Sequence, residues 1–201
     1  MDENEHSVYL TFDDGPIPES TPFILKTLEE YGAKATFFVV GDNVRKYPEH
    51  YQAILDAGHR IGTHTYNHIG CARHSIRFFE KNVNQSIDML NAPQFHTADG
   101  IRPLGDGTRP ILFRPPHGWM RPTQYIRYQE KFRIVMWDLV TRDYSHLLSP
   151  YDIVRNVQRY ARNGSIITFH DSLKSIDKLY FALPASLRWL KSQGYEFKVF
   201  D

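Results

Sequence analysis

The sequence predicts an α/β protein in which parallel strands alternate with helices, arranged as a sheet or a barrel. Short apolar runs of strand length recur along the 201 residues, and helical patterns separate them. A glycine closes most of these helical patterns, and the next strand run follows within a few residues. Polar residues stand at the ends of several strand runs, which is where the functional groups of a parallel barrel collect.

The first half of the chain follows the order strand, helix, glycine. The run 8–12 is apolar and rich in β-branched and aromatic residues, which is typical of a strand. Thr21 and Pro22 fit the N-cap and first position of a helix that ends at Gly32. By the same signs we expect a strand at 35–40, a helix from Pro48 to Gly58, a strand at 60–62 and a helix at 76–90.

The second half continues the pattern after a long interruption. Residues 92–110 contain several glycines and prolines and little periodicity, so we expect a long loop, which is usually functional or disordered. Ser149, Pro150 and Asp152 resemble a capping box at the start of a helix that runs to Asn163-Gly164. The remaining expected elements are strands at 111–113, 134–137, 165–169 and 195–200 and a helix at 183–193.

Composition limits the class of protein. A length of 201 residues with 41% hydrophobic and 23% charged residues predicts a single domain that spans 1–201. The net charge of +1 argues against a general nucleic-acid binder. No apolar stretch approaches the ~20 residues of a membrane span. The single cysteine, Cys71, excludes an internal disulfide framework and is expected to be a small buried residue.

The compartment stays open on sequence grounds. We expect no signal peptide in these residues, because the chain starts with acidic residues and enters a strand within a few positions. The chain as written would be cytoplasmic, whereas a chain trimmed of a leader would act outside the cytoplasm. The oligomeric state is equally open.

Two adjacent carboxylates, Asp13 and Asp14, stand where the first strand ends. Neighbouring side chains on a strand point to opposite faces, so both can serve one site only where the backbone bends. Gly15 and Pro16 supply such a bend. Like charges this close raise each other's pKa unless a cation neutralises one of them. The pair indicates either a metal site, with one carboxylate as ligand and the other free for proton transfer, or a solvated turn.

A second signal is the histidine pair His64 and His68. On a helix or helical turn, this i, i+4 spacing puts both imidazoles on one face. Two histidines and one carboxylate are a recurrent ligand set for catalytic zinc. Together with the aspartate pair, the histidines favour metal binding over a purely structural function. Other histidines, among them His59 and His74, lack such partners, and we expect them to be surface or core residues.

The remaining strand-end groups match the needs of metal-assisted acyl hydrolysis. His170, beside Asp171, is the natural general acid near neutral pH. Arg114 could hold a carboxylate through a bidentate pair. In the turn that follows Arg114 neither proline has an N–H, so the first available oxyanion donors are at His117 and Gly118.

In chain order, the segments TFDDGP, HTYNH, FRPPHG, WDLVTRDY and ITFHDS resemble the five motifs of the polysaccharide deacetylases (carbohydrate esterase family 4, the NodB-homology domain). The match extends from Val8 to about Phe200. The resemblance implies a distorted (β/α) barrel with seven or eight mostly parallel strands. It also implies a metal-dependent hydrolase whose partner is an acetylated glycan, from whose N-acetylated sugars it removes acetyl groups.

The resemblance also implies the metal ligands and the base. Asp13 looks like the catalytic base that activates water. Asp14, His64 and His68 look like the metal triad. The metal is usually Zn²⁺, with Co²⁺, Ni²⁺ or Mn²⁺ as other possibilities.

For the remaining groups, the resemblance implies positioning and proton donation. Arg114 is similar to the arginine that tethers the base. Asp143 resembles the aspartate that orients and tunes the catalytic histidine, and His170 looks like that general acid. The backbone N–H of His117 falls where the oxyanion donor of the family lies.

Several positions depart from the family pattern. His117 stands where tyrosine is usual, Tyr144 replaces a tryptophan that lines the pocket, and Val140 replaces an aspartate. Thr168 replaces a leucine that flanks the acetyl methyl group, which weakens an apolar pocket by about 1 kcal/mol. Ile69 stands where proline commonly follows the second histidine. None of these changes removes a catalytic group, but they leave the substrate open.

Two alternatives accompany this prediction. With the same mechanism, the protein could be an O-acetyl esterase on acetylated xylan or a deacylase of another small amide. A more remote alternative is a non-catalytic carbohydrate-binding protein that retains the fold. Such a protein would be expected to lose a metal ligand or His170, and the sequence has lost neither.

Overall fold

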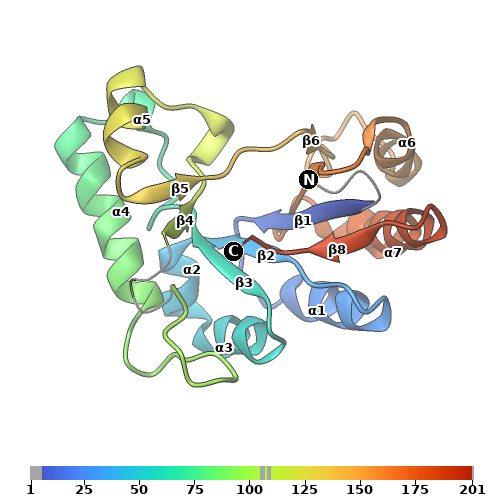
Figure 1. Ribbon diagram of the computed structural model, residues 1–201. Helices are drawn as coiled ribbons and strands as arrows, with labels where there is room; N and C mark the ends of the chain where they lie inside the picture. Colours follow the sequence, from blue (N-terminus) through green and yellow to red (C-terminus); the bar gives the residue numbers. More distant parts are fainter. Residues whose placement is uncertain (1–5, 105–106, 108–109, 201) are drawn as a thin grey trace.

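The strand β1 (Ser7–Asp13) lies at the centre of one parallel sheet (Figure 1). The computed structural model describes residues 6–104, 107 and 110–200. The sheet order is β5-β4-β3-β2-β1-β7-β6, and β8 also pairs with β1. The other strands are β2 (Thr36–Val39), β3 (Arg60–Thr63), β4 (Ile111–Phe113), β5 (Phe132–Ile134), β6 (Leu139–Val140), β7 (Ile166–His170) and β8 (Glu196–Lys198).

The sheet curls but does not close. All of its ladders in the described residues are parallel, and none joins the outer strands β5 and β6. β8 pairs with residues 7–9 of β1, and β2 pairs with residues 11–13 on the same edge. The result is a half-barrel. It confirms the predicted α/β class, the distorted (β/α) barrel and its seven or eight parallel strands.

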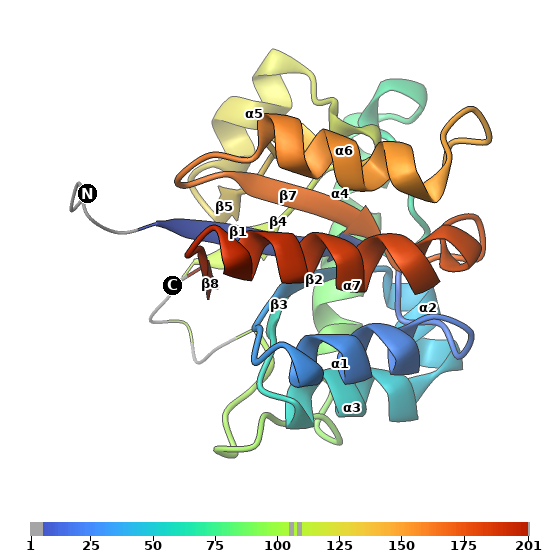
Figure 2. The same cartoon turned by 90° about the vertical axis from the view of Figure 1, so that its right-hand side faces the viewer.

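Helices cover the outside of this sheet. Figure 2 shows α6, α7, α1 and α3 as a layer in front of the strands, while α4 and α5 lie at the other end of the molecule in Figure 1. No helix in the described part of the chain is long and apolar enough to cross a membrane. The helices are α1 (Thr21–Glu30), α2 (Gly41–Lys46), α3 (Pro48–Asp56), α4 (Ile76–Leu90), α5 (Pro122–Tyr128), α6 (Pro150–Tyr160) and α7 (Ile176–Ser192), with the 3₁₀ turns η1 (Cys71–Arg73) and η2 (Pro116–Gly118).

The alternation of β1 separates the core from the site. Val8, Leu10 and Phe12 are buried in the main core, which the strands share with the helix layer. Because successive strand residues face opposite sides, Thr11 and Asp13 point to the other, concave face. Their strand therefore carries an apolar side that anchors it and a polar side that faces the hollow of the half-barrel.

Gly62 links the packing of this concave face to the site. A Cβ atom at Gly62 would lie 2.5 Å from Cε1 of Phe38 and 3.0 Å from Cβ of Leu112, both fully buried. The ring of Phe38 in turn lies 4.1 Å from the guanidinium carbon of Arg114. The absence of a side chain at Gly62 thus leaves room for the aromatic ring that supports a buried arginine.

We expect Gly62→Ala to lower the free energy of unfolding by about 1–3 kcal/mol, because the added methyl overpacks Phe38. Chemical denaturation measures the change. Gly70→Ala is the matched control, since its Cβ would approach only the ring of His117, at 3.1 Å. Equal losses of stability in the two variants would contradict the close packing described for Gly62.

Three helices differ from the sequence prediction. α7 begins at Ile176, well before the expected position 183, and Pro184 lies inside the helix rather than in its first turn. The sequence pattern did not predict the short helices α2 and α5. The capping box of α6 is confirmed, since Ser149 and Asp152 bond each other's backbone N–H groups. Ser20, not Thr21, is the N-cap of α1.

The expected strand at 134–137 was misplaced. β5 ends at Ile134, and the next residues cross the open side of the half-barrel toward β6. There the carbonyls of Val135 and Met136 accept hydrogen bonds from the Arg114 side chain at 3.1 and 2.8 Å. The predicted loop at 92–110 has no helix or strand among its described residues, and 105–106 and 108–109 lie outside them.

Candidate metal centre and active site

Asp13 and Asp14 turn to different partners at the end of β1. Asp13 is 3% exposed, and its Oδ1 accepts a hydrogen bond of 2.7 Å from Nη1 of Arg114. Asp14 has a positive φ of 81°, and its Oδ1 lies 3.2 Å from Nε2 of His68 and 3.7 Å from Nε2 of His64. The bend in the backbone therefore directs the two neighbouring carboxylates to different sides, Asp13 toward Arg114 and Asp14 toward the histidines.

His64 and His68 do not lie on a helix, so that part of the sequence prediction was wrong. They lie in the irregular loop after β3, where Thr65 and His68 have φ values of 68° and 54°. Oδ1 of Asn82, on α4, accepts the backbone N–H groups of Tyr66 and Asn67 at 2.9 and 3.2 Å. The two imidazoles come together because of the left-handed backbone at Thr65 and His68 and the hydrogen bonds from the loop to Asn82. Helical spacing plays no part.

These three side chains fit a divalent metal ion. The candidate ligand atoms of Asp14, His64 and His68 all lie within 4.8 Å of one another. Nδ1 of His64 lies 2.7 Å from the carbonyl oxygen of Arg114, so an Nδ1–H donor leaves the Nε2 lone pair directed toward Asp14. One carboxylate and two imidazole nitrogens are a suitable donor set for zinc and similar ions.

Both charge states in this cluster suit a metal ligand. Burial lowers the pKa of His64 to about 4 despite the nearby carboxylates of Asp13 and Asp14, so its imidazole is neutral at pH 7. Burial favours the neutral form of Asp14, but its hydrogen bond to His68 and the charges of the neighbouring histidines outweigh that effect. They lower the pKa of Asp14 to about 2. An ionised carboxylate and a neutral imidazole are the forms that bind a cation.

Arg114 is buried beneath Asp13. Besides Asp13, its Nη1 contacts Oγ1 of Thr11 at 2.8 Å and Oγ1 of Thr168 at 3.2 Å, while Nε and Nη2 reach the two carbonyls described above. Only one guanidinium nitrogen bonds Asp13, so the bidentate pair expected from the sequence does not form. Nη1 thus contacts β1 and β7, while Nε and Nη2 bond the segment after β5, so the guanidinium links these three parts of the chain.

His170 lies beside Asp13 in the β1–β7 register and is held by Asp143. Nδ1 of His170 is 2.7 Å from Oδ1 of Asp143, whose Oδ2 accepts the backbone N–H of His170 at 2.8 Å. Burial alone would lower the pKa of His170. The hydrogen bond and charge of Asp143, with the charges of Asp13 and Asp14, reverse this and raise the pKa to about 9.

The turn that carries Asp143 has an anchor that the sequence did not reveal. Arg142 has a φ of 58°, and Nζ of Lys178 on α7 donates to the carbonyls of Asp143 and Ser145 at 2.9 and 2.8 Å. A lysine on a helix ordinarily suggests a solvated face. No local pattern could have identified Lys178, because its partners lie more than thirty residues earlier in the chain.

Asp171 was also missed as a structural partner. Its carboxylate is fully buried and accepts hydrogen bonds from the hydroxyls of Ser20 and Thr21, the latter at 2.6 Å. Its N–H donates to the carbonyl of Asp13 at 2.7 Å. Burial raises the pKa of Asp171 to about 7 despite these hydrogen bonds. Through these bonds Asp171, directly after β7, is connected both to the end of β1 and to the start of α1. It therefore holds both ends of the segment that runs from Asp14 to α1.

The turn at η2 carries the two proposed oxyanion donors. The N–H of Gly118 donates to the carbonyl of Pro115 at 3.0 Å, so this N–H is engaged within the turn. Gly118 has a φ of 66°, and a Cβ atom at this position would lie 2.1 Å from Cη2 of Trp137. The turn therefore requires glycine here. The backbone N–H of His117 stays a prediction.

The two predicted pocket residues lie in different surroundings. Tyr144 is partly exposed, and its ring meets the ring of His170 edge-on at 4.7 Å. Thr168 is buried, and its hydroxyl lies 2.9 Å from that of Thr11. The Thr168 hydroxyl is therefore satisfied inside the half-barrel, and its effect on an acetyl pocket stays a prediction.

Comparisons with known proteins agree with this geometry. The family description "Polysaccharide deacetylase" matches residues 1–134. A peptidoglycan-N-acetylglucosamine deacetylase of Bacillus cereus is 34% identical over 96% of this chain and 86% of its own length. The peptidoglycan-N-acetylmuramic acid deacetylase PdaC of Bacillus subtilis is 32% identical over 98% of this chain, which spans 38% of PdaC. The crystal structure of the Bc1960 peptidoglycan N-acetylglucosamine deacetylase has a TM-score of 0.84 and 31% identity, over 97% of this chain and 86% of that one.

The fold and the site define an α/β protein with a candidate divalent-metal centre at the carboxyl ends of a parallel half-barrel. Within that class, the chain belongs to the polysaccharide deacetylase family, a family of deacetylase hydrolases. This confirms the resemblance that the five sequence motifs indicated.

Proposed function

We propose that this protein is a zinc-dependent deacetylase that hydrolyses the N-acetyl groups of sugars in a polysaccharide, and that residues 1–201 form one deacetylase domain. The observation that carries the proposal is the divergence of two adjacent carboxylates. Asp14 joins His64 and His68, while Asp13 stays on Arg114, 2.7 Å away. One dipeptide thereby provides a ligand and a separate proton acceptor.

The chain's own residues supply the proton transfers in this mechanism. Asp13, paired with Arg114, accepts the proton of the attacking water. His170, held by Asp143, donates a proton to the leaving nitrogen. The backbone N–H of His117 is our candidate for stabilising the oxyanion. Asp14, His64 and His68 would hold a zinc ion, which would supply a Lewis acid for the hydrolysis.

The substrate part of the proposal rests on the relatives. The B. cereus relative is named for N-acetylglucosamine and PdaC for N-acetylmuramic acid, both in peptidoglycan. We therefore propose an N-acetylated amino sugar in a glycan chain as substrate.

An acetate-release assay over a panel of glycans tests this function. The panel contains chitin oligosaccharides, peptidoglycan and acetylated xylan, each with zinc-loaded and chelator-treated protein. We expect acetate from an N-acetylated glycan, loss of that activity in chelator, and its return with zinc or cobalt. Acetate from xylan alone would replace the proposal with an O-acetyl esterase. Release that chelation leaves unchanged would contradict the metal mechanism.

The pH dependence of kcat is expected to report the pair Asp143 and His170. If His170 acts as the acid, its protonated form must be present, so activity falls as pH rises through about 9. Burial lowers the pKa of His170 and the charge of Asp143 raises it, and Asp143→Asn removes that charge. The pKa of His170 then falls, and the alkaline limb of the profile moves to lower pH. A limb that stays at the same pH in Asp143→Asn would assign it to another group.

A further inference from the structure

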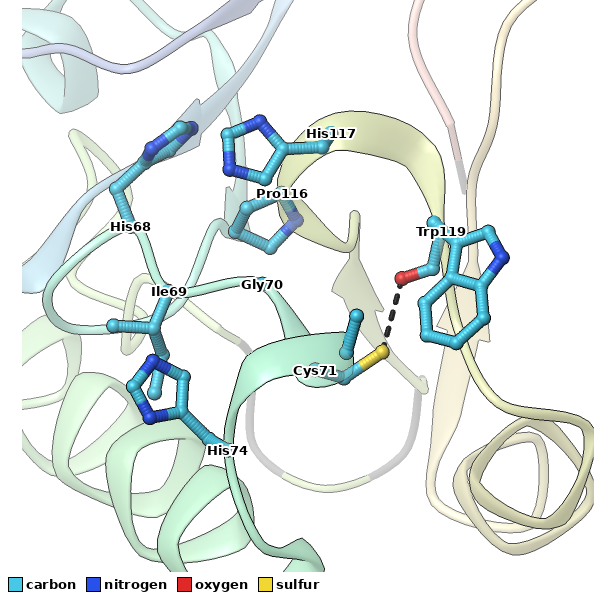
Figure 3. A pocket seen from close by; sticks show the side chains of 9 residues that line it. His68, Ile69, Gly70, Cys71, His74, Pro116, His117 and Trp119 are labelled. Atoms are coloured by element: carbon cyan, nitrogen blue, oxygen red, sulfur yellow. Dashed lines mark hydrogen bonds between the residues drawn. The ribbon is translucent and has the colours of Figure 1, made fainter.

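A pocket of about 490 Å³ adjoins the metal-binding cluster on the side of His68. It lies between the loop after β3, with η1, and the turn η2. In Figure 3, His68 and His117 lie along its upper side, His74 lies at the lower left, Trp119 at the right, and Cys71 between them. This volume is within the range of about 300–1,000 Å³ that small-molecule sites occupy.

Specific contacts hold the two walls of this pocket together. Sγ of Cys71 lies 3.0 Å from the carbonyl oxygen of Trp119, and Nη2 of Arg121 donates to the carbonyl of Ala72 at 3.1 Å (Figure 3). The rings of His68 and His117 meet edge-on with their centroids 5.0 Å apart. The pocket is thus built between two linked segments. Cys71 is buried, as predicted from the sequence, and is one of the residues that line the pocket.

The lining chemistry suits a sugar ring. The indole of Trp119 is 49% exposed and, with Ile69 and Pro116, offers apolar area to the C–H face of a pyranose. The imidazoles of His74 and His117 can donate to and accept from hydroxyl groups. The described lining contains no carboxylate and no lysine or arginine, so it does not favour a strongly charged ligand.

The position of the pocket specifies which sugar it would hold. His68 both belongs to the metal-binding triad and lines the pocket. A ring held in this pocket therefore lies beside the triad, not at a remote surface. This inference rests on the proposed function, under which the group at the triad is the acetamide of one sugar.

We propose that this pocket binds the neighbouring pyranose ring of the glycan chain, with Trp119 as the stacking surface. It makes the protein selective for oligomeric over single-ring substrates. Trp119 determines specificity and takes no part in the proton transfers. His74, which the sequence analysis left as a surface or core residue, contributes to this subsite.

The test separates glycan binding from turnover. Calorimetry measures the affinity of N-acetylated chitotetraose for zinc-loaded Asp13→Asn protein, with and without Trp119→Ala. We expect about tenfold weaker binding without the indole and recovery of most affinity in Trp119→Phe. Tyr125→Ala is the matched control, because Tyr125 is also 49% exposed but does not line the pocket. Its affinity should not change.

Kinetics in the otherwise unmodified enzyme provide the second measurement. Trp119→Ala should raise KM for chitotetraose about tenfold and leave hydrolysis of 4-nitrophenyl acetate, which has no second sugar ring, unchanged. Chitotetraose affinity that does not depend on Trp119, or no binding at all, would overturn the subsite even if acetate release succeeds. Trp119-dependent binding without acetate release would instead support the subsite and contradict the proposed deacetylase.

Discussion

Asp13→Asn is expected to reduce kcat for acetate release by about 10²–10⁴-fold, the usual contribution of a general base. The substitution removes the negative charge that accepts a proton but retains an oxygen that can accept the hydrogen bond from Arg114. Because Asp14, His64 and His68 are unchanged, the metal-binding cluster should persist. Acetate release under saturating glycan measures the effect, and thermal unfolding shows whether the variant is folded.

A matched control for this variant is Asp42→Asn. Asp42 also accepts a hydrogen bond from an arginine, Arg45, at 2.9 Å, but it lies on α2 outside the site. Its substitution should leave kcat unchanged. Asp13→Asn protein that is folded, metal-loaded and as active as the wild type would remove Asp13 from the mechanism.

Arg114→Met is expected to have the largest effect on stability, a loss of about 3–5 kcal/mol in the free energy of unfolding. The side chain of Arg114 is 0% exposed, and that of Asp13 is 5% exposed. Methionine would leave the Asp13 carboxylate buried without its cation, and it would leave the carbonyls of Val135 and Met136 without their donors. Denaturant unfolding measures this loss.

Arg127→Met provides the comparison. Arg127 and Glu80 form an ion pair of 3.0 Å, but the arginine side chain is 59% exposed. Exposed pairs contribute about 0–1 kcal/mol, so this control should unfold close to the wild type. If Arg114→Met lowered the free energy of unfolding as little as Arg127→Met does, the buried contacts of Arg114 would not be a major source of stability.

The features predicted from the sequence were those with a local physical cause. Short apolar runs located β1, β4 and β7 to within about two residues. The capping box at Ser149 located α6. The parallel arrangement then placed the strand-end groups at one edge of the sheet. That is why Asp13 and His170, far apart in sequence, were expected together and are register partners.

The features that escaped prediction depend on tertiary contacts. Arg114 bonds the backbone after β5, where the apolar run predicted a strand. Pro184 lies inside α7, whereas local preference places proline in the first turn. Lys178 and Asp171 act on segments far away in the chain. No pattern within a sequence window contains such pairs.

The prediction for the histidine pair was right in one respect and wrong in another. Its convergence on Asp14 was predicted, but the helical turn proposed to produce it was wrong. Positive φ values at Thr65 and His68, with Asn82 holding the loop, produce the same convergence. The chemistry of the residue types was therefore more informative than their spacing.

The most direct test of the central claim, that Asp14 binds the metal while Asp13 serves as the base, is the metal content of two single variants. Asp13→Asn and Asp14→Asn are purified in parallel, equilibrated with zinc, dialysed, and analysed by mass spectrometry of the metal. We expect about one zinc per chain in Asp13→Asn and much less in Asp14→Asn, with both variants inactive. Equal zinc content in the two variants, or loss of zinc from Asp13→Asn alone, would contradict this division of roles.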